Sequence, residues 1–88
     1  MSTKEKNLES TDIDSPESRS LILYNSQHLW NDVVNQLQKA TGYDLIRCEQ
    51  IAMIAHTKGK ATVKSGSYSE LAPINNVLKE INLVTEII

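Results

Sequence analysis

Two histidines and one cysteine are the side chains of this 88-residue sequence best suited to acid–base, nucleophilic or metal chemistry. Cys48 and His56 fall in one predicted helix, where their spacing separates them by about two turns, roughly 12 Å along the axis. That is too far for a direct hydrogen bond between a nucleophile and its base. His28 and His56 also lack the spacing of metal ligands on one helix face. The sequence therefore predicts no catalytic or metal site, and Cys48 is interpreted as a small core residue.

A Gly-Lys pair, Gly59-Lys60, is the feature closest to a nucleotide-binding loop. It has no upstream glycine at P-loop spacing and no Ser or Thr after the lysine, so no cofactor is expected. The remaining candidates for binding are His56, near the end of a predicted helix, and Asn25, at the end of a predicted strand. Each also has an ordinary structural explanation, because a helix C-terminus favours His and turns favour Asn.

The composition indicates one globular domain, with 40% hydrophobic and 23% charged residues. Residues 1–19 hold five of the 11 acidic and three of the 9 basic side chains, so they carry the whole net charge of −2. The neutral remainder lacks the basic surface that nucleic-acid binding requires. No apolar run approaches the roughly 20 residues that span a bilayer. The N-terminus lacks the apolar stretch of a signal peptide. No nucleic-acid or membrane contact is expected, and a cytoplasmic location is predicted.

Residues 1–19 are predicted to form a disordered tail, because they contain too few apolar side chains to offset the entropy of ordering. Residues 20–88 are predicted to form the folded domain. Its expected elements are a strand over 21–24, a helix from 30 to 41, a helix between Asp44 and Gly59, a strand over 60–64, a third helix and a closing strand over 83–88. The predicted fold is α+β, in the order β-α-α-β-α-β. A three-stranded, largely antiparallel sheet packs on three helices.

Three local features add detail to this prediction. Gly42 and Gly59 are expected as left-handed caps or stops of the first two helices, Asp44 as the N-cap of the second, and Asn82 as a cap of the third. Ser65-Gly66 is read as a turn. Ser67 and Glu70 have the spacing of a capping box, but Pro73 predicts that the main part of the third helix begins nearer the proline.

The second predicted helix has apolar residues on two faces. Leu45, Cys48, Ala52 and Ala55 form one row, and Ile51 and Ile54 form another. This distribution predicts that it is the most buried helix of the domain.

Several segments together resemble the ClpS family of Clp protease adaptors. His56-Thr57-Lys58-Gly59-Lys60 looks like the family's His-x-x-Gly-Lys block entering a strand, and Asn25 ends an earlier strand, as in the family. The resemblance extends over Leu21 to Ile88, and its closing segment, 83–88, is similar to the forms found in Bacteroidetes. It implies the same fold as the one predicted above, and no enzymatic activity.

The resemblance also implies a function. Family members bind substrates that begin with Leu, Phe, Tyr or Trp (N-degrons) and deliver them to an AAA+ unfoldase of the ClpA or ClpC type, with help from the N-terminal tail. The α-amino group is expected to bind Asn25 and His56, with Ser26 and Gln27 as further candidates. An imidazole accepts a hydrogen bond only when neutral, so acid is expected to weaken binding. The implied apolar pocket is formed by Trp30, Val33, Ala52, Ala55 and Leu83. The implied docking surface for the unfoldase spans 64–75 and includes Lys64 and Glu70.

The sequence departs from the family pattern after Asn25. The family usually places two aspartates there, whereas this chain has Ser26 and Gln27 in a loop that is one residue shorter. A charge-assisted hydrogen bond to the ammonium, which contributes about 1.5–3 kcal/mol, is therefore missing. Two readings follow. One is an adaptor with altered recognition of N-terminal residues, and the other is a regulatory domain that docks on the unfoldase without binding them.

Overall fold

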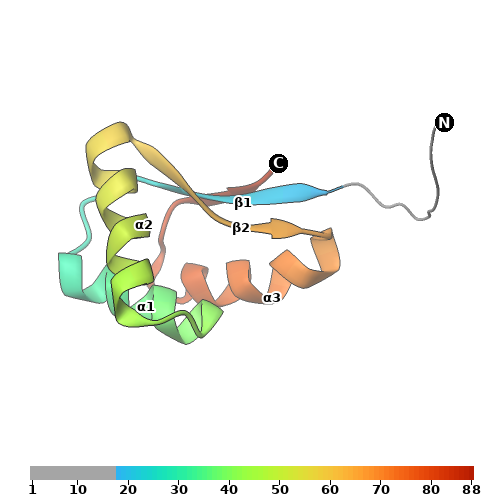
Figure 1. Ribbon diagram of the computed structural model, residues 1–88, viewed down its shortest axis with the longest axis horizontal. Coiled ribbons are helices and arrows are strands. Elements are labelled where there is room, and N and C mark those ends of the chain that lie inside the picture. The colour runs from blue at the N-terminus through green and yellow to red at the C-terminus, as the bar shows by residue number, and fades with distance from the viewer. Residues whose placement is uncertain (1–17) are drawn as a thin grey trace, which may run out of the picture.

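The computed structural model describes residues 18–88 and contains a sheet of three antiparallel strands beside three helices (Figure 1). The elements are β1 (Arg19–Tyr24), α1 (Trp30–Thr41), α2 (Leu45–Lys58), β2 (Lys60–Gly66), α3 (Tyr68–Leu78), a 3-10 turn η1 (Lys79–Ile81) and β3 (Thr85–Ile87). The strand order is β2-β1-β3. The predicted α+β fold and its order of elements are confirmed.

The sheet and the helices form two layers (Figure 1). α2 and α3 contact the strands, and α1 packs against these two helices. β1 lies at the centre of the sheet, and its Leu21 and Leu23 are fully or almost fully buried. They join Leu37 of α1 and Leu71 and Leu78 of α3 in one hydrophobic core. Since Phe is absent from the sequence, aliphatic side chains supply nearly all of the buried area.

The helix ends follow the capping residues that the sequence predicts. Gly42 and Gly59 follow α1 and α2 with φ angles of 75° and 91°, which residues other than glycine rarely adopt. The Asp44 carboxylate accepts a hydrogen bond from the backbone N–H of Arg47 at the start of α2. Asn82, at φ 62°, ends η1 in the same left-handed region. Local backbone preference therefore fixes where these helices stop.

The start of α3 differs from the prediction. The helix begins at Tyr68, directly after Ser67, and Pro73 lies inside it. Ser67 and Glu70 form the full capping box, with the Ser67 Oγ accepting from the Glu70 N–H and the Glu70 carboxylate accepting from the Ser67 N–H. The N–H that Pro73 lacks would have bonded the carbonyl of Ser69, in the first turn. The capping box outweighs that single missing bond.

Strand boundaries also differ. β2 continues through Ser65 and Gly66, which the sequence analysis assigned to a turn, because β1 starts early enough at Arg19 to pair with Gly66. The closing strand is shorter than predicted and covers only Thr85–Ile87. A disordered tail was predicted over residues 1–19. Residues 1–17 lie outside the described residues, whereas Arg19, the last residue of the predicted tail, belongs to β1.

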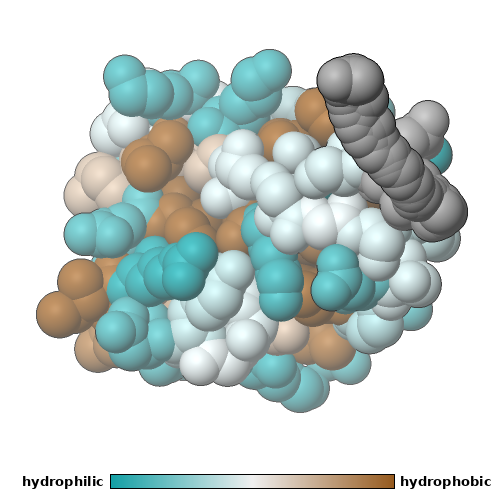
Figure 2. Space-filling view, turned by 45° about the vertical axis from the view of Figure 1, so that its right-hand side comes forward, coloured by the Kyte–Doolittle hydropathy of each residue, from teal (hydrophilic) through white to brown (hydrophobic). Residues whose placement is uncertain are grey.

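The outer face of α2 is exposed, contrary to prediction. Cys48, Ala52 and Ala55 are buried as expected, and so is Ile51, but Ile54 is 44% exposed. Leu45, at the start of the first predicted row, is 50% exposed because it lies in the first turn of the helix, and Ile46 and Met53 are also at least half exposed. On the face shown in Figure 2, hydrophilic side chains interrupt the apolar patches. None of the described helices is long and apolar enough to cross a membrane.

Candidate functional site

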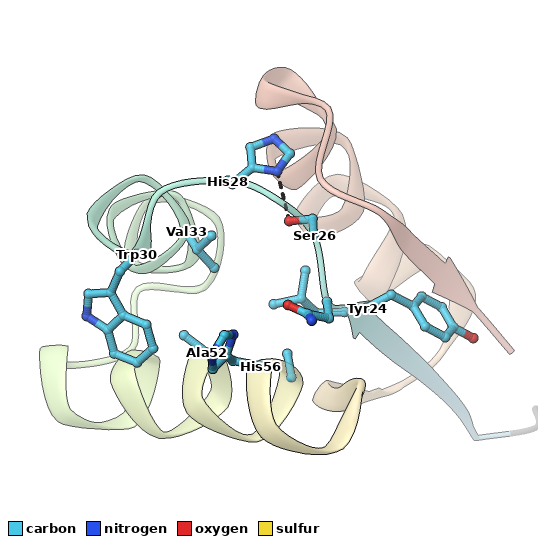
Figure 3. Close-up of a pocket in the computed structure, with 10 residues that line it drawn as sticks. Tyr24, Ser26, His28, Trp30, Val33, Ala52 and His56 are labelled. Atoms are coloured by element: carbon cyan, nitrogen blue, oxygen red, sulfur yellow. Dashed lines mark hydrogen bonds between the residues drawn. The ribbon is translucent and has the colours of Figure 1, made fainter.

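A cavity of about 230 Å³ opens where the end of β1, the loop that follows it, the start of α1 and the second half of α2 meet (Figure 3). Its floor and walls are largely apolar, and its rim carries amide, hydroxyl and imidazole groups. The lining residues are Leu23, Tyr24, Asn25, Ser26, His28, Trp30, Val33, Ala52, Ala55 and His56. None of these described residues is Asp or Glu, so the rim is uncharged when both imidazoles are neutral.

Backbone hydrogen bonds hold Asn25 beside the end of α2. The Asn25 N–H donates to the carbonyl oxygen of Gly59 at 2.9 Å, and the preceding Tyr24 N–H donates to that of Val84 at 2.8 Å. Gly59 is the residue that ends α2, three positions after His56. The junction between α2 and β2 therefore brings the amide and the imidazole, far apart in sequence, to one rim.

Small residues on α2 create the space of the cavity. Ala52 and Ala55 are each 4% exposed and face the interior, one turn apart. Larger apolar residues at these positions would fill the cavity. His56 follows Ala55 but is exposed, and Figure 3 shows His56 and Ala52 on the cavity side of the helix.

The first turn of α1 supplies the opposite wall. Trp30 and Val33 are one turn apart on α1, and Figure 3 shows both on the side of the helix that faces the cavity. Val33 is half-buried, whereas the Trp30 indole remains 39% exposed. The indole therefore forms part of the cavity mouth and is not buried in the hydrophobic core.

A second histidine holds the loop between β1 and α1. The His28 Nε2 lies 2.5 Å from the backbone carbonyl oxygen of Ile81, and its Nδ1 lies 2.8 Å from the Ser26 Oγ. These contacts tie the loop to the 3-10 turn η1, which is 53 residues further along the chain. Ser26 thus has a fixed position at the rim (Figure 3).

Most of the residues predicted for the site line this cavity, with Gln27 and Leu83 as the exceptions. Gln27 is exposed outside the lining. Leu83 is 2% exposed and packs in the hydrophobic core. Both positions were assigned from the family resemblance and not from the pattern of residues in this sequence.

Three further lining residues were missed by the sequence analysis: Leu23, Tyr24 and His28. Tyr24 turns its ring away from the cavity (Figure 3) and donates a hydrogen bond from its hydroxyl to Glu86 at 2.7 Å. This bond raises the pKa of the Tyr24 phenol, with smaller contributions from desolvation and from the Glu86 charge. The β-strand pattern predicted Leu23 as buried, but nothing in the sequence links His28 to its distant carbonyl.

Two features of the described residues bear on metal binding and on the reactivity of the cysteine. Among residues 18–88, no group of three or more His, Cys, Asp or Glu side chains could hold a metal ion. The thiol of Cys48 is fully buried, and desolvation raises its pKa, which disfavours the reactive thiolate. The apolar interior and polar rim of the cavity suit the binding of a small apolar group next to a hydrogen-bond donor.

The two residues predicted for unfoldase docking lie close to each other. Lys64 is exposed on β2, and Glu70 is exposed in the first turn of α3. Hydrogen bonds from Ser67 are the main cause of the lowered pKa of Glu70, and the positive charge of Lys64 lowers it further. Glu70 thus has a structural role in the capping box, in addition to any role at a surface.

Comparison with protein families gives one result. The family model described as ATP-dependent Clp protease adaptor protein ClpS matches residues 14–82. No curated protein matches the sequence. The matched segment contains every residue that lines the cavity.

Proposed function

Since the chain belongs to the ClpS family and is a Clp protease adaptor, we propose that it binds substrates with large apolar N-terminal residues and delivers them to a ClpA- or ClpC-type AAA+ unfoldase. The observation that carries this proposal is the cavity, which combines an apolar interior with a rim of hydrogen-bond acceptors. Its volume of about 230 Å³ is below the roughly 300–1,000 Å³ of drug-sized ligand sites. That size suits one amino acid side chain.

The rim suits the α-amino group of the same residue. An ammonium has three N–H donors and no acceptor, so it requires acceptors around it. Asn25 offers its amide oxygen, His56 offers a bare ring nitrogen when neutral, and Ser26 offers its hydroxyl oxygen. Because none of them is charged, each bond is expected to contribute at the lower end of the range for bonds to an ion, about 1.5–3 kcal/mol. Recognition therefore depends on several weak bonds.

Fluorescence anisotropy with labelled peptides tests this proposal. Peptides that begin with free Leu, Phe, Tyr or Trp are expected to bind, and their N-acetylated counterparts are expected to bind at least tenfold more weakly, because acetylation removes the charge and two of the donors. Asn25→Ala and His56→Ala are expected to reduce binding of the free form. Asn76→Ala, at an exposed position on α3, is the matched control. Equal affinity for free and acetylated peptides would exclude the proposal.

One observation favours a second candidate, a regulatory domain that docks on the unfoldase without holding an N-terminal residue. The described cavity rim contains no carboxylate, so it offers an ammonium no hydrogen bond in which both partners are charged. In that case the protein would change the degradation of other substrates while no N-terminal peptide binds. Lys64 and Glu70 are the proposed docking residues in both cases.

A further inference from the structure

The hydrogen bonds of His28 determine which way the Ser26 hydroxyl points. The backbone carbonyl of Ile81 can only accept, so the His28 Nε2, 2.5 Å away, must carry a hydrogen and donate it. In a neutral imidazole this is the only ring hydrogen, which leaves Nδ1 bare. Nδ1 lies 2.8 Å from the Ser26 Oγ and can therefore only accept from it.

The direction of the Ser26 hydroxyl determines what a ligand in the cavity can bind. When the Ser26 hydroxyl hydrogen is directed to His28, the lone pairs of its oxygen are left for a ligand. A free serine hydroxyl rotates and presents either a donor or an acceptor. The tautomer of His28 removes that choice, and the carbonyl of Ile81 fixes the tautomer. A chain of bonds from η1 to the rim thus presents an acceptor where a cationic donor would bind.

From this geometry we propose that His28 is a positioning residue that orients Ser26 as an acceptor for the α-ammonium group of a bound N-terminal residue. The inference rests on the proposed function and extends it, because it assigns a residue outside direct contact with the amine to recognition of that amine. Ser26 then completes, with Asn25 and His56, a set of three acceptors for the three ammonium hydrogens. No carboxylate is required.

Two substitutions separate this role from a simple tether of the loop. His28→Gln places an amide N–H near the position of Nε2, so it keeps the donor to Ile81 but loses the acceptor for Ser26. His28→Asn places an amide oxygen near the position of Nδ1, so it keeps the acceptor for Ser26 but loses the tether. The readout is selectivity, the ratio of affinities for a free and an acetylated Leu-initiated peptide.

If His28 orients Ser26, His28→Gln and Ser26→Ala each reduce selectivity by roughly tenfold, the effect of one hydrogen bond to an ion at the lower end of its range. His28→Asn keeps most of it. The double variant Ser26→Ala/His28→Gln loses no more than either single variant, because both remove the same bond. Thermal unfolding followed by circular dichroism is measured for every variant. The ¹⁵N–¹H correlations of the His28 ring in the folded wild type report the tautomer directly.

The outcomes are distinguishable. A selective wild type whose selectivity survives His28→Gln, or is lost only in His28→Asn, overturns the inference and leaves the proposed function intact. Independent, additive losses from the two single variants also overturn it, as does a ring hydrogen on Nδ1 alone. A wild type without selectivity overturns both the inference and the proposed function.

Discussion

Trp30 gives the cavity a spectroscopic probe at its mouth. It is the only tryptophan in the sequence, and its indole is 39% exposed beside the opening. A ligand side chain that enters the cavity must pass the indole and shield part of it from water. The tryptophan fluorescence of the protein therefore reports on this one position.

We expect a saturating peptide with free N-terminal Leu and no aromatic residue to shift the Trp30 emission to shorter wavelengths, because the ligand replaces water around the indole. The acetylated peptide, at the same concentration, serves as the control and should give a smaller shift, because it binds more weakly. Unchanged emission at a concentration where anisotropy shows saturation would mean that the peptide binds elsewhere.

A second prediction concerns the alanines that leave the cavity open. Ala52→Leu adds three carbon atoms at a position that is 4% exposed, so the new side chain must occupy the cavity or strain its walls. Affinity for peptides with N-terminal Phe or Trp is expected to fall at least tenfold, as judged by anisotropy. The control is Ala72→Leu on α3, which does not line the cavity. If Ala52→Leu retained its affinity, Ala52 would not line the part of the cavity that the ligand side chain occupies.

At the level of single residues, the sequence was informative where a role depends on local context. Cys48 was predicted to be a core residue because it lies in the apolar row of α2, and its burial confirms that prediction. His28 was not predicted as a lining residue, because its partner is a carbonyl 53 positions away that no local pattern reveals. Leu83 was placed in the pocket by resemblance, whereas it packs in the core.

At the level of elements, Gly59 at the α2–β2 junction has two roles. It ends the helix, and its carbonyl oxygen accepts the hydrogen bond that holds the backbone of Asn25. Gly42 has only the first role, at the end of α1. An added Cβ would meet no neighbouring atom within 4 Å at either glycine, so the effect of substitution is conformational strain at positive φ.

Gly59→Ala and Gly42→Ala are therefore expected to lower the free energy of unfolding by a similar amount, about 1–2 kcal/mol each. Only Gly59→Ala should also weaken peptide binding, since relief of the strain shifts the carbonyl that holds Asn25. Urea denaturation measures the first effect, and anisotropy the second. If Gly42→Ala weakened binding as much as Gly59→Ala, general destabilisation would explain the loss.

The capping box of α3 predicts a dependence on pH. Hydrogen bonds from Ser67 hold the pKa of Glu70 below its ordinary value. A carboxyl whose pKa is lower in the folded state stabilises the fold above its unfolded pKa, and this contribution is lost as the pH falls through the folded pKa. Glu70→Gln should thus lower the melting temperature at about pH 7 but have less effect at about pH 3. Glu49→Gln on α2 controls for loss of charge, and an effect that is independent of pH would contradict the assignment.

The helix ends were predictable because Gly42, Gly59 and Asp44 carry their conformational preference locally. The start of α3 was not predictable, because the capping box favours a helix that begins at Tyr68 and Pro73 favours a later start. The sequence does not show which of the two effects is larger. The length of β2 also depends on its partner strand: Ser65 and Gly66 pair with residues of β1 that are more than forty positions earlier.

At the level of the whole molecule, the two proposed surfaces lie toward opposite ends of the sheet. Lys60, at the start of β2, pairs with Tyr24 beside the cavity, whereas Gly66, at its end, pairs with Arg19. Lys64 and Glu70 are near the latter end, and Figure 1 shows the start of α3 far from α2. A bound N-terminal residue and a docked unfoldase would therefore not compete for the same residues.

The proposal that this adaptor selects substrates by their free, large N-terminal residue can be tested in a degradation assay. A fluorescent reporter with N-terminal Leu is incubated with a ClpA- or ClpC-type unfoldase and its protease, with and without this protein. We expect faster degradation of the Leu reporter when the protein is added, no effect on an otherwise identical reporter with N-terminal Ser, and loss of the effect in Asn25→Ala. Equal effects on both reporters, or inhibition of both, would contradict it.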